Sequence, residues 1–508
     1  TDSILDFRGT GIVTGPVKLE SGTLKSSGSP TILGTLTQFN NATIEVSVDQ
    51  TLSYSGPPIS LGSSTLSLSG GGSFANTNSL VLDNSASKLL LSSITVENVS
   101  TSVDNSLGVE VENDSTINSF SIANITPVSI GTGKTLSGSI GVTGGSIKLT
   151  DTGTLASTIS MSAETTLDAD NSLTVSGVLT QSGDITIDVA ETSTLTYTGT
   201  PISLGGFTLA LSGGGNLVSG GLDLNNPNSK LLLNSITIDS VSTSVDNSLG
   251  VEVENDSTIN SFTVSNITPV SIGTGKTLSG VIGVTGGSIK LTDTGTLAST
   301  VSMSGETTLD ADNSLTLSGA LTQSGDITID VLGNQTLIYT GPPLSLGTNT
   351  LSIDGAGTLN NASGSPLVLD QTDSILDFRG TGIVTGPVKL ESGTLKSSGS
   401  PTILGTLTQF NNATIEVSVD QTLSYSGPPI SLGSSTLSLS GGGSFANTNS
   451  LVLDNSASKL LLSSITVENV STSVDNSLGV EVENDSAINN FTVSNITPVS
   501  IGTGKTLS

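Results

Sequence analysis

The sequence contains no cysteine and no histidine. Without cysteine there can be no disulfide framework and no thiolate site. Without histidine the usual zinc sites, Ser-His-Asp triads and near-neutral proton shuttles are excluded. Tryptophan is absent and aromatic residues make up 3% of the 508 residues, too few for a thick globular core. A thin core is still supported, because 34% of the residues are hydrophobic.

Basic residues are scarce as well. Fourteen Lys and Arg face 43 Asp and Glu, which gives a formal charge of −29. So few cations cannot form the basic stripe that phosphate neutralisation requires, so we expect no nucleic-acid partner. No apolar run approaches the ~20 residues that cross a bilayer, and we expect no membrane span in this segment. Neither an initiator methionine nor a signal segment is seen, which suggests a mature product or a fragment.

The chain is organised by repeats. The pattern TLxYxGxPxSLG occurs at 51–62, 194–205, 336–347 and 422–433, and the tripeptide Leu-Thr-Gln keeps the same intervals of 143, 142 and 86 residues. At their sum, 371, residues 1–137 return as 372–508 with five substitutions. Such repeats replace the usual estimate of domain number and predict a modular architecture.

Local patterns predict strands throughout. Ile44, Val46 and Val48 alternate with polar residues, which is strand periodicity, and Gly- and Asn-rich turns follow the alternating runs. Almost no helix is expected, because no window keeps apolar residues at helical spacing. A strand and turn cycle recurs about every 20 residues, so the short module lacks about three whole cycles. We therefore predict one continuous parallel β-solenoid over 1–508, with about 20 residues per coil.

Three carboxylate lines repeat with the modules. Their members stand at i, i+2 and i+4, which places them on one face of a strand: Glu110, Glu112 and Asp114, then Glu252, Glu254 and Asp256, then Glu481, Glu483 and Asp485. Paired carboxylates can serve glycoside chemistry. Because the line is copied with the whole module, we interpret it as a solvated acidic face, and we expect no catalytic residue and no enzyme.

Two acidic pairs before turns offer oxygen ligands. Asp168 and Asp170, and their copies Asp310 and Asp312, are the only metal candidates, and the metal would be calcium. A turn held by bonds from these side chains to the backbone explains the pattern equally, so no cofactor is predicted.

Tyr54, Tyr197, Tyr339 and Tyr425 are the four tyrosines of the chain. They could form a row of carbohydrate-stacking or self-association points. The preferred interpretation is that each covers the end of the core beside a proline turn. Threonine-rich segments suggest an ice-binding array, but their irregular intervals argue against one.

The modules together resemble a known type. TLxYxGxPxSLG segments, LTQSGDITIDV strands and GGSIKLTDTGTLAST turns look like the long repetitive β-helix surface proteins of prokaryotes, of the filamentous-haemagglutinin-like adhesin and autotransporter-passenger type. The resemblance covers the whole chain in style and carries no site residues. It implies export to the cell surface, a right-handed parallel β-helix and an adhesive or scaffolding role.

Two classes of function follow. The first is an extracellular structural fibre or cell-surface stalk, part of a longer filament or one that self-associates end to end or laterally. The alternative is a surface adhesin that binds glycans or neighbouring cells through the acidic or tyrosine rows. A polysaccharide-active β-helix enzyme is less favoured.

Overall fold

The computed structural model describes residues 3–37, 40–362, 364–408 and 410–508. The protein is an all-β parallel β-solenoid with about 21 residues per turn, and the described residues contain no helix. The predicted fold and coil length are thus confirmed. The chain forms two compact units, Thr1–Ser242 and Thr243–Ser508, which are described separately below. The expectation of a single continuous solenoid over 1–508 stays a prediction.

Alternation builds each strand. In β7 (Ala42–Val46) the side chains of Ala42, Ile44 and Val46 are fully buried, while Thr43 and Glu45 between them are half-buried. Neighbouring strands pair in parallel with partners about one coil apart, as in Leu66↔Leu89 and Leu89↔Val109. Backbone groups therefore bond from coil to coil, and Leu, Ile and Val stack into a continuous narrow core in each unit.

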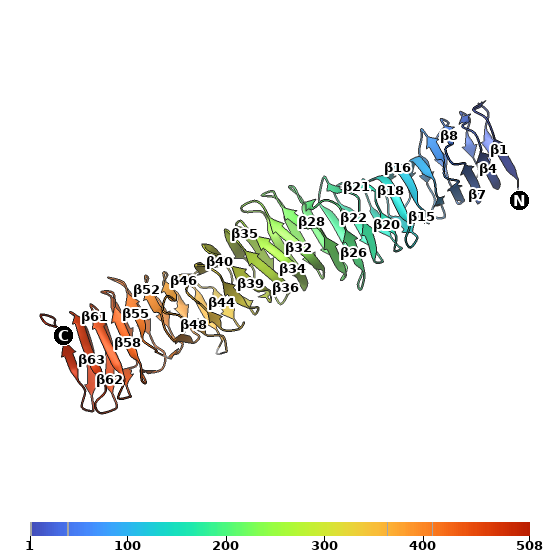
Figure 1. The fold of residues 1–508 in the computed structure, drawn as a ribbon. Coiled ribbons are helices and arrows are strands. Elements are labelled where there is room, and N and C mark those ends of the chain that lie inside the picture. The colour runs from blue at the N-terminus through green and yellow to red at the C-terminus, as the bar shows by residue number, and fades with distance from the viewer. Residues whose placement is uncertain (1–2, 38–39, 363, 409) are drawn as a thin grey trace. The chain divides into compact units, whose positions relative to one another are not determined.

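Two main sheets enclose this core. We call the first the charged sheet, because most of the charged strand residues lie on it. Figure 1 labels strands of both sheets. In unit 1 the charged-sheet strands used below are β10 (Thr65–Ser69), β13 (Lys88–Ser92), β15 (Gly108–Asn113), β17 (Thr126–Ile130), β19 (Ser146–Leu149), β22 (Thr165–Ala169), β25 (Ile185–Val189) and β28 (Thr208–Ser212). In unit 2 they are β37 (Ser288–Leu291), β40 (Thr307–Ala311), β43 (Ile327–Val331), β46 (Thr350–Gly355), β49 (Ile375–Phe378), β61 (Lys459–Ser463) and β63 (Gly479–Asn484).

The second is the hydroxyl sheet, whose outward residues are mostly Ser and Thr. Its strands used below in unit 1 are β8 (Thr51–Tyr54), β11 (Ser73–Asn76), β14 (Thr95–Thr101), β16 (Ser115–Ile122), β18 (Thr135–Val142), β20 (Thr154–Leu155), β21 (Thr158–Met161), β23 (Leu173–Val175), β24 (Leu179–Gln181), β26 (Thr194–Tyr197), β27 (Ile202–Ser203) and β29 (Asn216–Ser219). In unit 2 they are β36 (Thr277–Val284), β38 (Thr296–Leu297), β41 (Leu315–Leu317), β44 (Thr336–Tyr339), β59 (Ser444–Asn447), β62 (Thr466–Thr472) and β64 (Ala487–Val493).

Candidate functional site

The four tyrosines are interior groups. Each is at most 3% exposed, and Tyr54, for example, donates from its hydroxyl to Pro57 O at 2.7 Å. Burial raises the pKa of the Tyr54, Tyr339 and Tyr425 phenols. The interpretation of the tyrosines as covers of the core beside a proline turn is confirmed. The alternative, a row of stacking or self-association points, is wrong because the rings are inaccessible.

The same tyrosines connect the two sequence markers. The Leu amide of Leu-Thr-Gln donates to the tyrosine hydroxyl one coil later: Leu36 to Tyr54 at 3.4 Å, Leu179 to Tyr197 at 3.1 Å and Leu321 to Tyr339 at 3.5 Å. Sequence reasoning missed this link. The signal for it was the constant interval of 18 residues between the leucine and the tyrosine.

The carboxylate lines do not form one acidic row. Glu110 on β15 pairs with Lys88 of the preceding coil at 2.5 Å, and Asp114 lies beyond the strand, where it accepts the Thr135 amide at 2.8 Å. A bulge shifts the register between Leu91 and Ser92, so alternation stops at Glu112. The copy on β63 behaves alike, with Lys459 and Glu481 at 2.6 Å. The expectation that three carboxylates share one strand face is therefore wrong.

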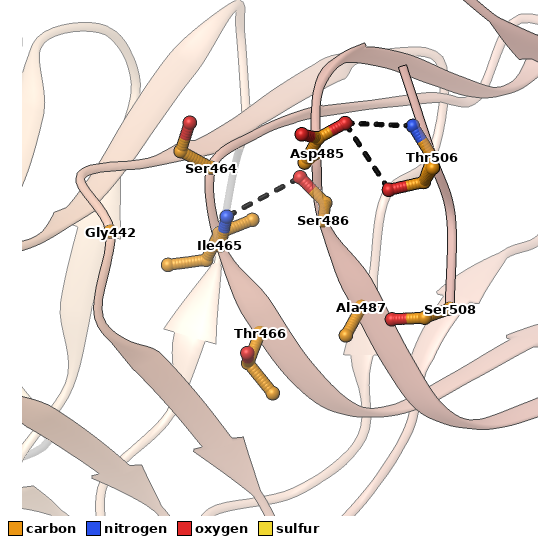
Figure 2. A pocket seen from close by; sticks show the side chains of 9 residues that line it. All are labelled: Gly442, Ser464, Ile465, Thr466, Asp485, Ser486, Ala487, Thr506 and Ser508. Carbon is orange, nitrogen blue, oxygen red and sulfur yellow. Dashed lines mark hydrogen bonds between the residues drawn. The ribbon is translucent and has the colours of Figure 1, made fainter. Parts of the chain in front are cut away.

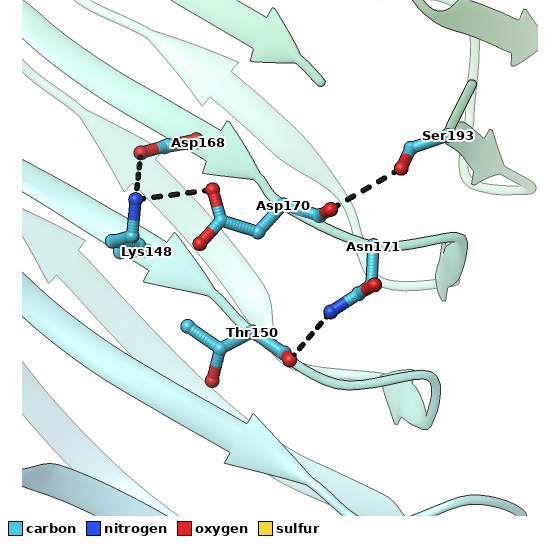
Figure 3. A network of polar contacts seen from close by, with 6 residues as sticks. All are labelled: Lys148, Thr150, Asp168, Asp170, Asn171 and Ser193. Atoms are coloured by element: carbon cyan, nitrogen blue, oxygen red, sulfur yellow. Dashed lines mark hydrogen bonds and ion pairs between the residues drawn. The ribbon is translucent and has the colours of Figure 1, made fainter. Parts of the chain in front are cut away.

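An ammonium group lies between the first pair of calcium candidates. Lys148 Nζ on β19 is 3.1 Å from Asp168 Oδ2 and 3.0 Å from Asp170 Oδ1, as Figure 3 shows. The hydrogen bonds that Lys148 donates to Asp170 and Asp168 raise the pKa of Lys148. The pKa of Asp168 is also raised, because burial of its carboxyl outweighs the attraction of the lysine.

The turn beside this ion pair is held by amide and hydroxyl groups. Asn171 Nδ2 donates to Thr150 O at 2.7 Å, and the Ser193 hydroxyl donates to Asp170 O at 3.2 Å (Figure 3). These bonds fit the alternative that the sequence offered, a turn held by side chain to backbone bonds.

The second pair is arranged similarly in unit 2. Lys290 Nζ is 3.0 Å from Asp312 Oδ2, and burial raises the pKa of the neighbouring Asp310. Within the described ranges, no group of three or more acidic side chains is placed to hold a metal ion. Calcium binding by the four aspartates therefore gains no geometric support, since Lys148 lies between the first two carboxylates and Lys290 bonds Asp312 of the second pair.

Charge and hydroxyl groups are segregated. From β16 to β29, the hydroxyl-sheet strands of unit 1 carry no Asp, Glu, Lys or Arg. Along the hydroxyl sheet from β8 onward, the register aligns outward Ser and Thr residues into columns on successive coils. One column is Thr51, Ser73, Thr95, Thr116 and Ser137, and another is Thr135, Thr154, Thr174 and Thr196.

Sequence spacing alone does not reveal these columns. Partners such as Thr135↔Thr154 and Thr174↔Thr196 are in register although their separations in the sequence differ. The turns absorb the differences in coil length. Cross-strand Thr pairs stabilise a sheet, so the columns have a structural role in unit 1 whatever else they contact. The expectation that the chain has no ice-binding array stays a prediction.

A concave feature lies at a corner between the two sheets. In unit 2 a polar hollow of about 340 Å³ opens where β62 and β64 begin (Figure 2). Its lining residues are Gly442, Ser464, Ile465, Thr466, Asp485, Ser486, Ala487, Thr506 and Ser508. We call it the corner groove. A copy of about 300 Å³ lies in unit 1, with Thr116 at the place of Ala487.

Local hydrogen bonds shape the groove. Ser464 has a positive φ of 57°, and its carbonyl accepts the Gly442 amide at 2.6 Å. The Ser486 hydroxyl accepts the Ile465 amide at 3.3 Å, and Asp485 Oδ1 accepts the Thr506 amide at 2.8 Å (Figure 2). The lining can offer hydroxyl groups and one carboxylate to an uncharged polar ligand. It has no lysine, arginine or aromatic ring, so it suits neither phosphate nor ring stacking.

Comparisons with known proteins assign the chain to no family. No protein-family model, no curated protein and no solved structure matches the chain. The described residues include no helix long and apolar enough to cross a membrane.

Proposed function

We propose that the protein is a structural element of an extracellular fibre or cell-surface stalk. One observation carries the proposal: ion pairs between neighbouring coils recur at corresponding places in the two copies of residues 1–137. Lys88 with Glu110 in unit 1 and Lys459 with Glu481 in unit 2 are such a repeated pair. When a solenoid is lengthened by further copies of its repeat, each copy adds such pairs without changing those already present.

Export to the cell surface and self-association belong to the same proposal. The resemblance to repetitive β-helix surface proteins supports the extracellular location. An open end of a parallel solenoid presents unpaired strand groups, which pair readily with another coil or another molecule. Lateral contact between molecules would use the hydroxyl sheet. The net charge of each molecule is −29, so the charged sheets of two molecules repel each other.

Electron cryo-microscopy of the native material tests the fibre. Long filaments with an axial spacing near ~4.8 Å are expected, since that is the distance between paired strands. Compact particles, or stalks that end in a distinct globular head, would contradict a purely structural role and favour a binding tip.

The second candidate function is an adhesin that binds glycans through the corner grooves. The observation that favours it is their repetition, with the same polar lining in units 1 and 2. Replacing Thr95 and Thr466 together by tryptophan would fill both grooves. A glycan array should then lose the signals seen with the unchanged chain, while Thr174→Trp, outside the grooves, should keep them. Equal binding by all three proteins would eliminate the grooves as the contact surface.

A polysaccharide-active enzyme is the third and least favoured candidate. Glu110 and Glu481 are held by lysines, and the lining of the corner groove in each unit includes one copied carboxylate, Asp114 or Asp485.

A further inference from the structure

Two aspartates on neighbouring strands of unit 2 face each other in register. Asp330 on β43 pairs with Asp354 on β46, at the ~4.8 Å spacing of adjacent strands. Asp310 on β40 is the register partner of Asp330 on its other side. Three carboxyl groups thus form a column on the charged sheet, which we call the aspartate column.

Unit 1 contains the same column with one difference. Asp168 and Asp188 take the places of Asp310 and Asp330, but Ser212 on β28 stands where unit 2 has Asp354. The Ser212 hydroxyl donates a hydrogen bond to Asp188 Oδ1. An ionised Asp354 has no proton to donate, so two negative groups meet in unit 2 where unit 1 has a donor and an acceptor.

The surroundings of Asp330 make it costly to hold a second negative charge, that of Asp354, beside its carboxylate. A Cβ atom added to Gly355 would lie 2.5 Å from Asp330 Oδ1, so the carboxylate packs closely against the β46 backbone. The charged groups on the strands that flank β43 are Asp310 and Asp312 at β40, with Lys290 on β37 beyond it, and Asp354 on β46. The strand after β46, β49, carries Asp377, and Arg379 follows it. Lys290 bonds Asp312, and Arg379 bonds Asp377.

We propose that the aspartate column is an acid-responsive clamp between coils. On acidification one proton enters the Asp330 and Asp354 pair, and the protonated carboxyl donates to the other carboxylate, as Ser212 does to Asp188. Repulsion between β43 and β46 then becomes a hydrogen bond, and this part of unit 2 tightens.

The expected direction follows from proton linkage. Burial, and then the charges of Asp354 and Asp312, raise the pKa of Asp330 above its ordinary value. The folded chain therefore holds this proton more tightly than the unfolded chain. Local stability is lowest above the folded pKa and rises as the pH falls through it toward the ordinary aspartate pKa of about 3.9.

Hydrogen exchange followed by mass spectrometry tests the clamp, because the peptides covering β43 to β46 and β25 to β28 differ in sequence. Rates are corrected with unstructured peptides of the same sequence. Between pH 7 and pH 4, the protection of residues 350–355 against hydrogen exchange should rise. The rise should be at most about tenfold for each pH unit by which the pKa of Asp330 lies above its ordinary value. Peptide 208–212 should change less.

Two reciprocal variants make the test specific. Asp354→Ser copies the unit 1 arrangement and should raise protection at pH 7 and flatten its pH dependence. Ser212→Asp should bring that dependence into unit 1. The same pH dependence in the unchanged chain and Asp354→Ser would overturn the proposal, as would a Ser212→Asp chain whose protection of 208–212 does not vary with pH.

Discussion

At the scale of single residues, the tyrosine and glycine of TLxYxGxPxSLG act together. A Cβ atom on Gly341 would lie 2.2 Å from Gly319 O and 2.7 Å from the Tyr339 ring, closer than such atoms approach. The glycine lets the chain turn over a buried ring whose hydroxyl bonds Pro342 O. The tyrosine and the glycine of the repeated motif are therefore explained by packing at this turn.

Gly341→Ala should therefore lower the free energy of unfolding locally, by about 1–3 kcal/mol as overpacking usually does. Gly283 is the matched control, because a Cβ atom there would meet nothing within 4 Å. Hydrogen exchange of 336–347 in the two variants checks this. Equal protection in both would show that the turn adapts to a methyl group.

A second residue-scale prediction concerns a buried asparagine. Asn76 is fully buried; its Nδ2 donates to Asn78 O at 3.0 Å, and its Oδ1 accepts the amides of Glu97 and Asn98 at 3.2 and 3.3 Å. Asn76→Ala leaves these backbone groups without partners, at a cost of about 1–3 kcal/mol for each group left buried and unpaired.

The copy of this site is an internal control. Asn447 makes the same contacts in unit 2, and the substitution itself distinguishes the peptide of β11 from that of β59 by mass. Exchange should accelerate in β11 and stay unchanged in β59. Unchanged exchange in β11 would mean that water replaces the lost side chain.

At the scale of strands and coils, alternation predicted the inside and the outside well. The buried Ile44 and Val46 and the outward Thr43 and Glu45 are where the pattern placed them. Val48, predicted to lie on the same face as Ile44, is wrongly placed by the pattern, because β7 ends at Val46 and the Val48 side chain is 64% exposed in the turn that follows. Register was harder, because coils differ in length: Ile4 pairs with Thr23, whereas Ile353 pairs with Phe378. Turn residues set these lengths, and their conformations cannot be read from periodicity.

The same limit governs the candidate site. That Lys148 reaches Asp168 depends on a coil of 20 residues, and that Lys88 reaches Glu110 depends on one of 22. Without the register, four aspartates resembled a cation site and three carboxylates resembled one row. The corner groove had no signal beyond a glycine-rich turn, since it arises where separate coils meet.

The charge pairs predict one effect at this scale. Lys459→Met removes the partner of Glu481 but keeps an apolar stem of similar length. Both side chains are partly exposed, so the loss should be small, about 0–1 kcal/mol, and should shrink further at high salt. Local exchange of 459–463 measures it. A loss several times larger would show that the pair organises β61 and β63.

At the scale of the whole chain, the modules should be exchangeable. Removing 143–284 joins Val142 to Thr285 and recreates the junction already present at Val142 and Thr143, since Thr-Gly-Gly-Ser follows in both places. Each coil contacts mainly its neighbours, so the shortened chain should fold with the same strand content per residue. Circular dichroism and digestion by a broad-specificity protease check this.

Removing 143–274 instead is the control. It joins Val142 to Gly275, so strands and turns no longer fall at matching positions in the coils on the two sides of the junction. That chain should lose protease resistance. If both deletions behaved alike, stability would not depend on matching neighbours, and the modular description would fail.

The near-identity of 1–137 and 372–508 also bears on how the chain finds its structure. A strand such as β13 has an equally suitable partner in the other copy, so long-range mispairing competes with correct pairing. Native partners lie only about one coil away, and closing so short a loop costs less entropy than closing one of 371 residues. Growth coil by coil from a formed edge is therefore the kinetically favoured route, and copies that differ only between 116 and 123 can coexist without exchanging strands.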